Sequence, residues 1–132
     1  MIFVDTNYFL RFLLAGGEEQ RREAKELFKK GALGKVKLFT SVIVFFEIYW
    51  VLFSFYKKDK NEVKKILSNV LKMDFVEFAE RQILTKSVLT MDKFSFDLED
   101  AYNIIFSLKQ KAKDFMTFDK ELRKKFRGLD IG

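Results

Sequence analysis

Four acidic residues, Asp5, Glu47, Asp100 and Asp119, lie beside apolar segments rather than within charged stretches. The chain contains no His and no Cys, which excludes imidazole and thiolate catalysis and the corresponding metal ligands. Any hydrolysis must therefore use carboxylates, Lys, Tyr, hydroxyl groups or a bound metal ion. Carboxylate oxygens are ligands for hard cations such as Mg²⁺ and Mn²⁺. Because such a cation activates water and polarises a phosphoryl oxygen, these four residues predict metal-assisted phosphate chemistry.

Two of the four acids come directly after a segment that we expect to form a strand. Asp5 follows Ile2–Val4, a continuous apolar triplet typical of a strand covered on both faces, and Asp119 follows FMTF at 115–118. In open parallel α/β sheets, ligands gather at the carboxyl ends of the strands. Asp5 and Asp119 can therefore converge although they are far apart in the sequence. Taken singly, each is also explained as a helix N-cap.

Glu47 is the only charged residue in the apolar run Val42–Tyr56. We expect this run to form a buried helix, because it is shorter than the roughly 20 residues that span a bilayer. Aromatic and aliphatic neighbours leave Glu47 little access to water, and an unpaired buried carboxylate is costly. An ion pair with an Arg such as Arg11, or exposure at the helix edge, would resolve the conflict. A cation shared with other carboxylates explains the placement better.

The remaining acid has a rival one turn earlier in the helical pattern DLEDAYNIIFSL. Asp97 could be the N-cap and Asp100 the third residue of an acidic first turn, which the helix dipole favours. The spacing alone does not choose between these two residues. The small Ala101 next to Asp100 favours close packing or ligand approach at that position.

The chain carries 25 Lys and Arg against 19 Asp and Glu, a net charge of +6 that favours polyanionic partners. Clusters of basic residues could hold a polyanion backbone, although each cluster taken alone is more simply a solvated face. They are Arg21/Arg22/Lys25, Lys57/Lys58/Lys60 and Lys120/Arg123/Lys124. A basic leader before an apolar segment is not seen at the N-terminus, and we therefore expect a cytoplasmic protein without a membrane span.

Strand and helix patterns alternate along the 132 residues. The expected strands cover 2–4, 36–40, 74–79, 115–118 and 129–131. The expected helices cover 7–15, 17–34, 42–56, 62–73, 80–93, 97–113 and 119–126, with Ser41 as the N-cap of the third. This order predicts an α/β fold with a central, mainly parallel sheet of four to five strands. Without a linker or repeat, residues 1–132 are predicted to form one domain.

Four segments, VDTNYFLRFLL, SVIVFFEIYWVL, FDLEDAYNI and MTFDKEL, resemble in order the four acidic motifs of PIN-domain nucleases. The resemblance is nearest to the VapC-type ribonuclease toxins of toxin–antitoxin pairs. It implies a three-layer α/β/α sandwich and an endoribonuclease that depends on Mg²⁺ or Mn²⁺. The implied catalytic and metal-binding residues are Asp5, Glu47, Asp100 and Asp119. Since the family motif has a small residue after its third acid, Ala101 favours Asp100 over Asp97.

The same resemblance implies polar residues that orient ligands or water around the acids. They match Thr6, Asn7, Thr117 and, as an assisting carboxylate, Asp97. It also implies an RNA substrate, a cognate antitoxin protein and a homodimer. An interface would account for the aromatic surplus of the 49–56 segment, whereas packing all 17 Phe into one core is the alternative.

Two other functions compete with the nuclease. A non-catalytic RNA- or protein-binding module of the same fold would leave the acids structural. A phosphatase resembling haloacid dehalogenases would use Asp5 as a nucleophile, but such enzymes usually have a second Asp where this chain has Asn7. The segment KFSF at 93–96 is unusually rich in Phe for the rim of a nuclease site, and it could alter substrate entry.

Overall fold

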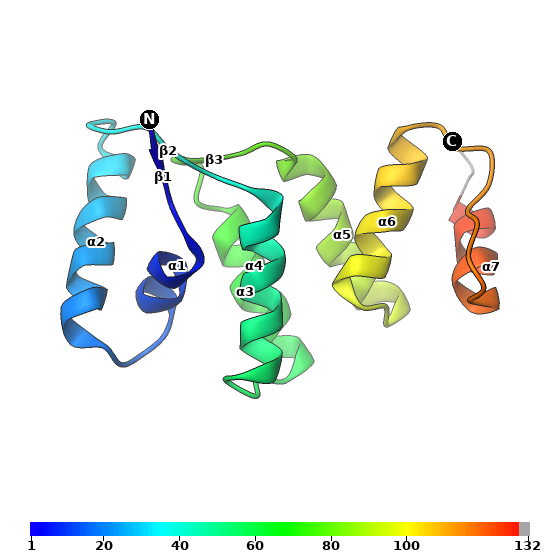
Figure 1. Ribbon diagram of the computed structural model, residues 1–132, viewed down its shortest axis with the longest axis horizontal. Helices are drawn as coiled ribbons and strands as arrows, with labels where there is room; N and C mark the ends of the chain where they lie inside the picture. Colours follow the sequence, from blue (N-terminus) through cyan, green and yellow to red (C-terminus); the bar gives the residue numbers. More distant parts are fainter. Residues whose placement is uncertain (130–132) are drawn as a thin grey trace. The chain divides into compact units, whose positions relative to one another are not determined.

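The computed structural model describes residues 1–129, and the chain forms two compact units, the first Met1–Arg81 and the second starting at Gln82. Figure 1 labels the elements. The first unit contains β1 (Ile2–Phe3), α1 (Thr6–Leu13), α2 (Glu18–Ala32), β2 (Leu38–Thr40), α3 (Val42–Ser54), α4 (Lys60–Leu71) and β3 (Val76–Phe78). The second contains α5 (Arg81–Phe94, whose first residue ends the first unit), α6 (Leu98–Lys109) and α7 (Lys120–Leu129). The single domain predicted over 1–132 stays a prediction.

The strands of the first unit form a parallel sheet in the order β1-β2-β3. Ile2 pairs with Leu38 and Leu38 with Val76, so β2 is central. Beyond β1, the backbone N–H of Val4 donates to the carbonyl of Phe39 at 2.9 Å. The hydroxyl of Thr40 then donates to the carbonyl of Val4 at 2.7 Å. These bonds place the chain after β1 and the start of α3 together at the carboxyl ends of the strands.

The predicted α/β class with a parallel sheet is confirmed, but the sheet has three strands within residues 1–129 rather than four to five. The segment 115–118 is not a strand. Phe115 packs on Phe126 with ring centroids 5.4 Å apart, whereas Met116 is 80% and Phe118 105% exposed. Side-chain bonds shape this segment instead, because Asp114 accepts from the amide of Phe115 at 2.8 Å. The last predicted strand covered 129–131. Leu129 is instead the last residue of α7, and 130–131 lie outside the described residues.

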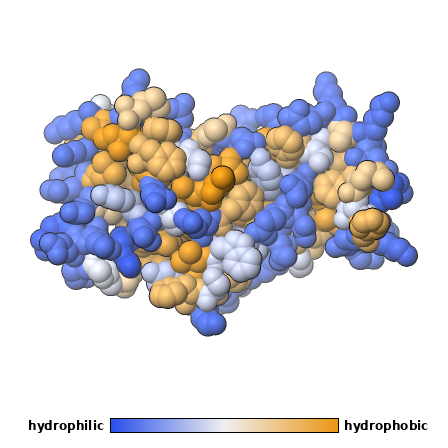
Figure 2. Space-filling model, in the orientation of Figure 1, coloured by the Kyte–Doolittle hydropathy of each residue, from blue (hydrophilic) through white to orange (hydrophobic). Residues whose placement is uncertain are grey.

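The expectation that β1 is covered on both faces is wrong. Ile2 and Phe3 are 42% and 47% exposed, and only Val4 after them is buried. Within residues 1–129 both β1 and β3 are edge strands, yet Val76 and Phe78 of β3 are buried, so the edge position alone does not account for the exposure of β1. Figure 2 shows apolar side chains gathered over this part of the first unit.

The core of the first unit is aromatic, as the composition predicts. Phe9 is fully buried and packs on Phe28 at 5.4 Å and on Phe78 at 6.3 Å between ring centroids. Arg81 closes the loop before β3, since its guanidinium donates to the carbonyls of Leu71, Met73 and Val76. Burial lowers the pKa of Arg81, an effect that Asp74 opposes.

The second unit has a smaller core between α6 and α7. Ile104, Leu122 and Phe126 form its centre, and Phe96 and Phe115 pack against it. Outside this core, Arg123 donates to Asp114 at 2.6 Å and Arg127 donates to the same carboxylate at 3.2 Å. Both the core and this pair of bonds hold α7 in place within the unit.

Several aromatic residues remain outside the cores, so the alternative that all Phe residues fill the interior is wrong. Trp50 is 61% and Phe55 75% exposed, both on or next to α3. None of the helices within residues 1–129 is long and apolar enough to span a membrane.

Candidate functional site

Asp5 lies at the carboxyl end of β1, where the chain turns into α1. Its carboxylate accepts from the amide of Thr6 at 2.8 Å, and Asp5 is the N-cap of α1. The residue is exposed, so the N-cap role expected for an isolated Asp does not remove its carboxylate from water. Asp5 therefore both starts the helix and presents a negative charge at the edge of the sheet.

Glu47 is exposed, which corrects the prediction that its neighbours bury it. The buried residues of α3, including Phe45, Ile48 and Leu52, follow one side of the helix. Glu47 instead shares the opposite side with exposed Ile43 and Trp50 at helical spacing. The apolar composition of α3 conceals this division, because its exposed side also carries large apolar residues.

Thr6 connects the first two predicted acids. Its side chain is nearly buried, at 4% exposure, and its hydroxyl donates to the Oε1 of Glu47. The sequence left open an ion pair between Glu47 and Arg11. Arg11 instead donates to Gln20 at 2.9 Å and to Tyr56 at 3.4 Å. The amide of Thr6 contacts Asp5 and its hydroxyl contacts Glu47. Thr6 thus holds both carboxylates together at the carboxyl end of β1.

In the second unit, Asp97 and Asp100 lie at the start of α6 as the spacing predicts. Asp97 is the N-cap by its backbone, because its carbonyl accepts from the amide of Ala101 at 3.0 Å, yet its side chain makes no capping bond. Asp100 is the third residue of the helix and is half-buried. Ala101 is fully buried, which explains why a small residue stands next to Asp100.

Asp119 caps α7, with its carboxylate accepting from the amide of Leu122 at 3.1 Å. The amide of Asp119 donates to the hydroxyl of Thr117 at 3.1 Å. Thr117 therefore contacts the backbone of Asp119, and the role predicted for it in orienting ligands or water stays a prediction. The Asp119 side chain remains exposed.

The two other candidate acids of the second unit affect Asp100. Partial burial raises the pKa of Asp100 above its ordinary value, and the nearby charges of Asp97 and Asp119 raise it further. They share a cleft of about 330 Å³, which we call the acidic cleft. Its lining residues are Phe94, Ser95, Phe96, Asp97, Asp100, Asp119, Glu121, Leu122 and Lys125. A carboxylate whose pKa is raised by burial and by neighbouring acids is stabilised in its charged form when a cation binds beside it.

The sequence patterns did not identify Glu121, Lys125 or the two Phe residues as part of this cleft. Glu121 lies in the first turn of α7, two residues after Asp119, and this spacing in the sequence was the available signal. Phe94 and Phe96 belong to the Phe-rich segment 93–96 and line this cleft, and an effect of this segment on substrate entry stays a prediction.

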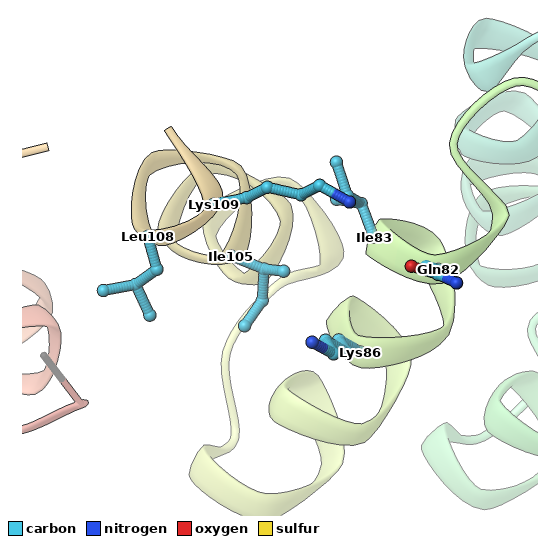
Figure 3. A pocket seen from close by; sticks show the side chains of 6 residues that line it. All are labelled: Gln82, Ile83, Lys86, Ile105, Leu108 and Lys109. Atoms are coloured by element: carbon cyan, nitrogen blue, oxygen red, sulfur yellow. The ribbon is translucent and has the colours of Figure 1, made fainter. Parts of the chain in front are cut away.

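Another cleft of the second unit, of about 360 Å³, has different chemistry. Figure 3 shows it between α5 and α6. It is lined by Gln82, Ile83, Lys86, Ile105, Leu108 and Lys109. With lysines, aliphatic side chains and no carboxylate, it offers none of the predicted metal chemistry. We call it the lysine cleft.

Asn7 lies elsewhere in the first unit. It is exposed and lines a small cleft of about 130 Å³ together with Tyr8, Arg11, Gln20 and Glu23. The role predicted for Asn7 in orienting ligands or water stays a prediction.

Within residues 1–129, no three acidic side chains lie close enough together to hold a metal ion. Asp5 and Glu47 belong to the first unit, and Asp100 and Asp119 to the second. The donor chemistry, carboxylate oxygens without imidazole or thiolate, fits a hard divalent cation. Within either unit as described, the donor set is incomplete, so coordination by all four predicted ligands stays a prediction.

Comparison with known families matches residues 2–127 to the PIN domain. The matched range includes both groups of carboxylates, from Asp5 to Asp119. Comparison with curated proteins gave no match. PIN domains are generally nucleases, and they generally use divalent metal ions. The parallel sheet, the alternating helices and the acids at the strand and helix ends agree with this match, and the chain belongs to the PIN-domain family.

Proposed function

We propose that this chain is a divalent-metal-dependent endoribonuclease in which Asp5, Glu47, Asp100 and Asp119 bind Mg²⁺ or Mn²⁺. The observation that carries the proposal is the PIN match, because it spans both groups of carboxylates in one family pattern. The exposure of Asp5 and Glu47 and the crowding of Asp97, Asp100 and Asp119 support it. When bound, the cation would activate water and stabilise charge on the phosphoryl oxygens.

The residues of the chain itself have distinct tasks in this proposal. Thr6 orients the Glu47 carboxylate through its hydroxyl, and Thr117 orients Asp119 through the backbone. Asp97, whose side chain does not cap α6, is available to orient a water molecule at the cleft. The net charge of +6 favours binding of an RNA backbone.

Replacing Asp5 by Asn tests the proposal, since Asn caps a helix about as well as Asp but carries no charge. We expect Mg²⁺-dependent cleavage of a long single-stranded RNA to fall about 100-fold while the thermal unfolding midpoint stays the same. Asp59→Asn is the matched control, because Asp59 caps α4 through a 2.9 Å bond with the amide of Glu62. It should cleave at the wild-type rate.

Persistent wild-type cleavage by the Asp5→Asn variant would show that the catalytic assignment is wrong. RNA binding without any cleavage by the wild type would favour the alternative, a non-catalytic RNA- or protein-binding module. Turnover of a small phosphate monoester, lost in Asp5→Asn, would favour the phosphatase.

We further propose a VapC-type context, in which the nuclease is a cytoplasmic homodimer inhibited by an antitoxin protein. Support comes from the resemblance of the four motifs to such toxins and from the exposure of Trp50 and Phe55. Light scattering after size exclusion should give the mass of a dimer, and co-expression with the product of an adjacent reading frame should suppress cleavage. A monomer at every concentration would exclude the dimer.

A further inference from the structure

The turn between α5 and α6 has an unusual backbone that brings two aromatic rings together. Ser95 has a φ of 58°, in the left-handed region that residues other than Gly seldom adopt. The amide of Phe96 donates to the carbonyl of Met91 at 3.2 Å and closes the turn. The rings of Phe94 and Phe96 lie with centroids 5.8 Å apart and an interplanar angle of 32°.

Both rings line the acidic cleft beside Asp97 and Asp100. Phe96 also packs against the core of the second unit, which fixes its position. Phe94 is half-exposed like Phe96 but is outside the set of residues that form or pack against this core, and we call it the outer ring. Because the outer ring does not pack against this core, core packing does not explain its place at the cleft.

Two cations accompany the outer ring. The Nζ of Lys93 lies 5.3 Å and that of Lys125 5.1 Å from the centroid of Phe94. Aromatic rings with nearby cations are the combination by which proteins bind single-stranded nucleic acids, because bases stack on the ring while the cations attract phosphates. Base stacking is stronger than a solvent-exposed lysine–ring contact. A base can therefore displace one lysine, which then remains close to the backbone.

We infer that the Phe94–Ser95–Phe96 turn is a stacking platform for an unpaired nucleobase next to the acidic cleft. This inference rests on the proposed nuclease function and adds to it a binding site for one base, which must be unpaired because a paired base cannot present its face to a ring. The lysine cleft in Figure 3 provides the contrast, since its aliphatic lining with Lys86 and Lys109 contains no ring on which a base could stack.

Binding of RNA that cannot be cleaved tests this inference. In an Asp5→Asn background, a fluorescently labelled single-stranded RNA and the same strand with abasic sites are titrated in Mg²⁺ by anisotropy. We expect the intact strand to bind about 10-fold more tightly than the abasic strand, and more tightly than a duplex of the same sequence. Phe94→Leu should remove most of this preference, and Phe94→Trp should retain it.

Phe106→Leu is the matched control, because Phe106 is 39% exposed in the same unit but does not line the acidic cleft. It should change binding by less than about two-fold. Equal affinity for intact and abasic strands, or an unchanged preference in Phe94→Leu, would overturn the inference. Base-dependent binding by a protein that never cleaves RNA would support the stacking platform and contradict the nuclease function. Cleavage without base-dependent binding would support the nuclease function and contradict the platform.

Discussion

The two groups of candidate carboxylates are held in opposite ways. In the first unit, Thr6 contacts both acids, donating from its amide to Asp5 and from its hydroxyl to Glu47. In the second unit, partial burial raises the pKa of Asp100, and the charges of Asp97 and Asp119 raise it further. The first group is stabilised by donors of its own unit, whereas the second contains mutual repulsion.

This contrast indicates which group of carboxylates a bound cation would stabilise more. Hydrogen-bond donors already offset part of the charge of Asp5 and Glu47. Asp100 has two neighbouring carboxylates that disfavour its ionised form, and a divalent cation would reverse that effect. We therefore expect the second group to respond more strongly to metal and to charge removal, and the first to respond to loss of one hydroxyl.

The largest expected effect is stabilisation by metal. Mn²⁺ at about 100 times its dissociation constant should raise the free energy of unfolding by about 2.7 kcal/mol. Asp100→Asn should lose most of this gain, because it removes the carboxylate whose pKa burial and the neighbouring charges raise. Chemical denaturation with and without Mn²⁺ measures the difference, and Asp59→Asn serves as the control. Equal stabilisation of Asp100→Asn and the wild type would exclude Asp100 as a metal ligand.

An intermediate effect is expected at Thr6. Thr6→Val keeps the branched shape but removes the donor to Glu47, which should cost about 1 kcal/mol of unfolding free energy and reduce cleavage. Thr6→Ser keeps the hydroxyl and should retain most of the activity. Urea unfolding and RNA cleavage assays of both variants provide the measurement. If Val and Ser behave alike, the hydroxyl does not position Glu47.

The smallest expected effect is on the pH dependence of stability. Because the pKa of Asp100 is raised in the folded protein, its ionised form reduces stability at pH values above that pKa. Asp100→Asn should therefore be more stable than the wild type at pH 7, by less than about 1 kcal/mol for a partly exposed group. The difference should shrink as the pH falls through the folded-state pKa. Urea unfolding in metal-free buffer at several pH values tests this.

Asp114 provides the opposite case within the same unit. Hydrogen bonds from Arg123, the amide of Phe115 and Arg127 hold the pKa of Asp114 far below its ordinary value. Its contribution to stability is present above the ordinary pKa of an aspartate and is lost as the pH falls through the lowered value. Asp114→Asn should therefore be less stable than the wild type at pH 7. If both variants shift stability in the same direction, the electrostatic contrast within the second unit is wrong.

Several local features of this protein follow from the sequence alone. Ser41 was predicted as an N-cap, and its hydroxyl accepts from the amide of Val44 at 3.2 Å. The positions of Asp97 and Asp100 at the start of α6 were also predicted. The alternation of strands and helices indicated the α/β class, and the four acidic motifs indicated the PIN family. These features depend on neighbouring residues, so the sequence alone carries them.

Tertiary packing sets which helix faces are exposed to solvent and which side chains from distant segments contact each other. Glu47 is exposed because α3 packs by its other side, and Thr6 reaches it from 41 positions away. The segment 115–118 reads as a strand, yet within the second unit it remains irregular, since a strand requires a pairing partner that no local pattern supplies. Burial and long-range hydrogen bonds arise from packing between distant segments, and composition does not specify them.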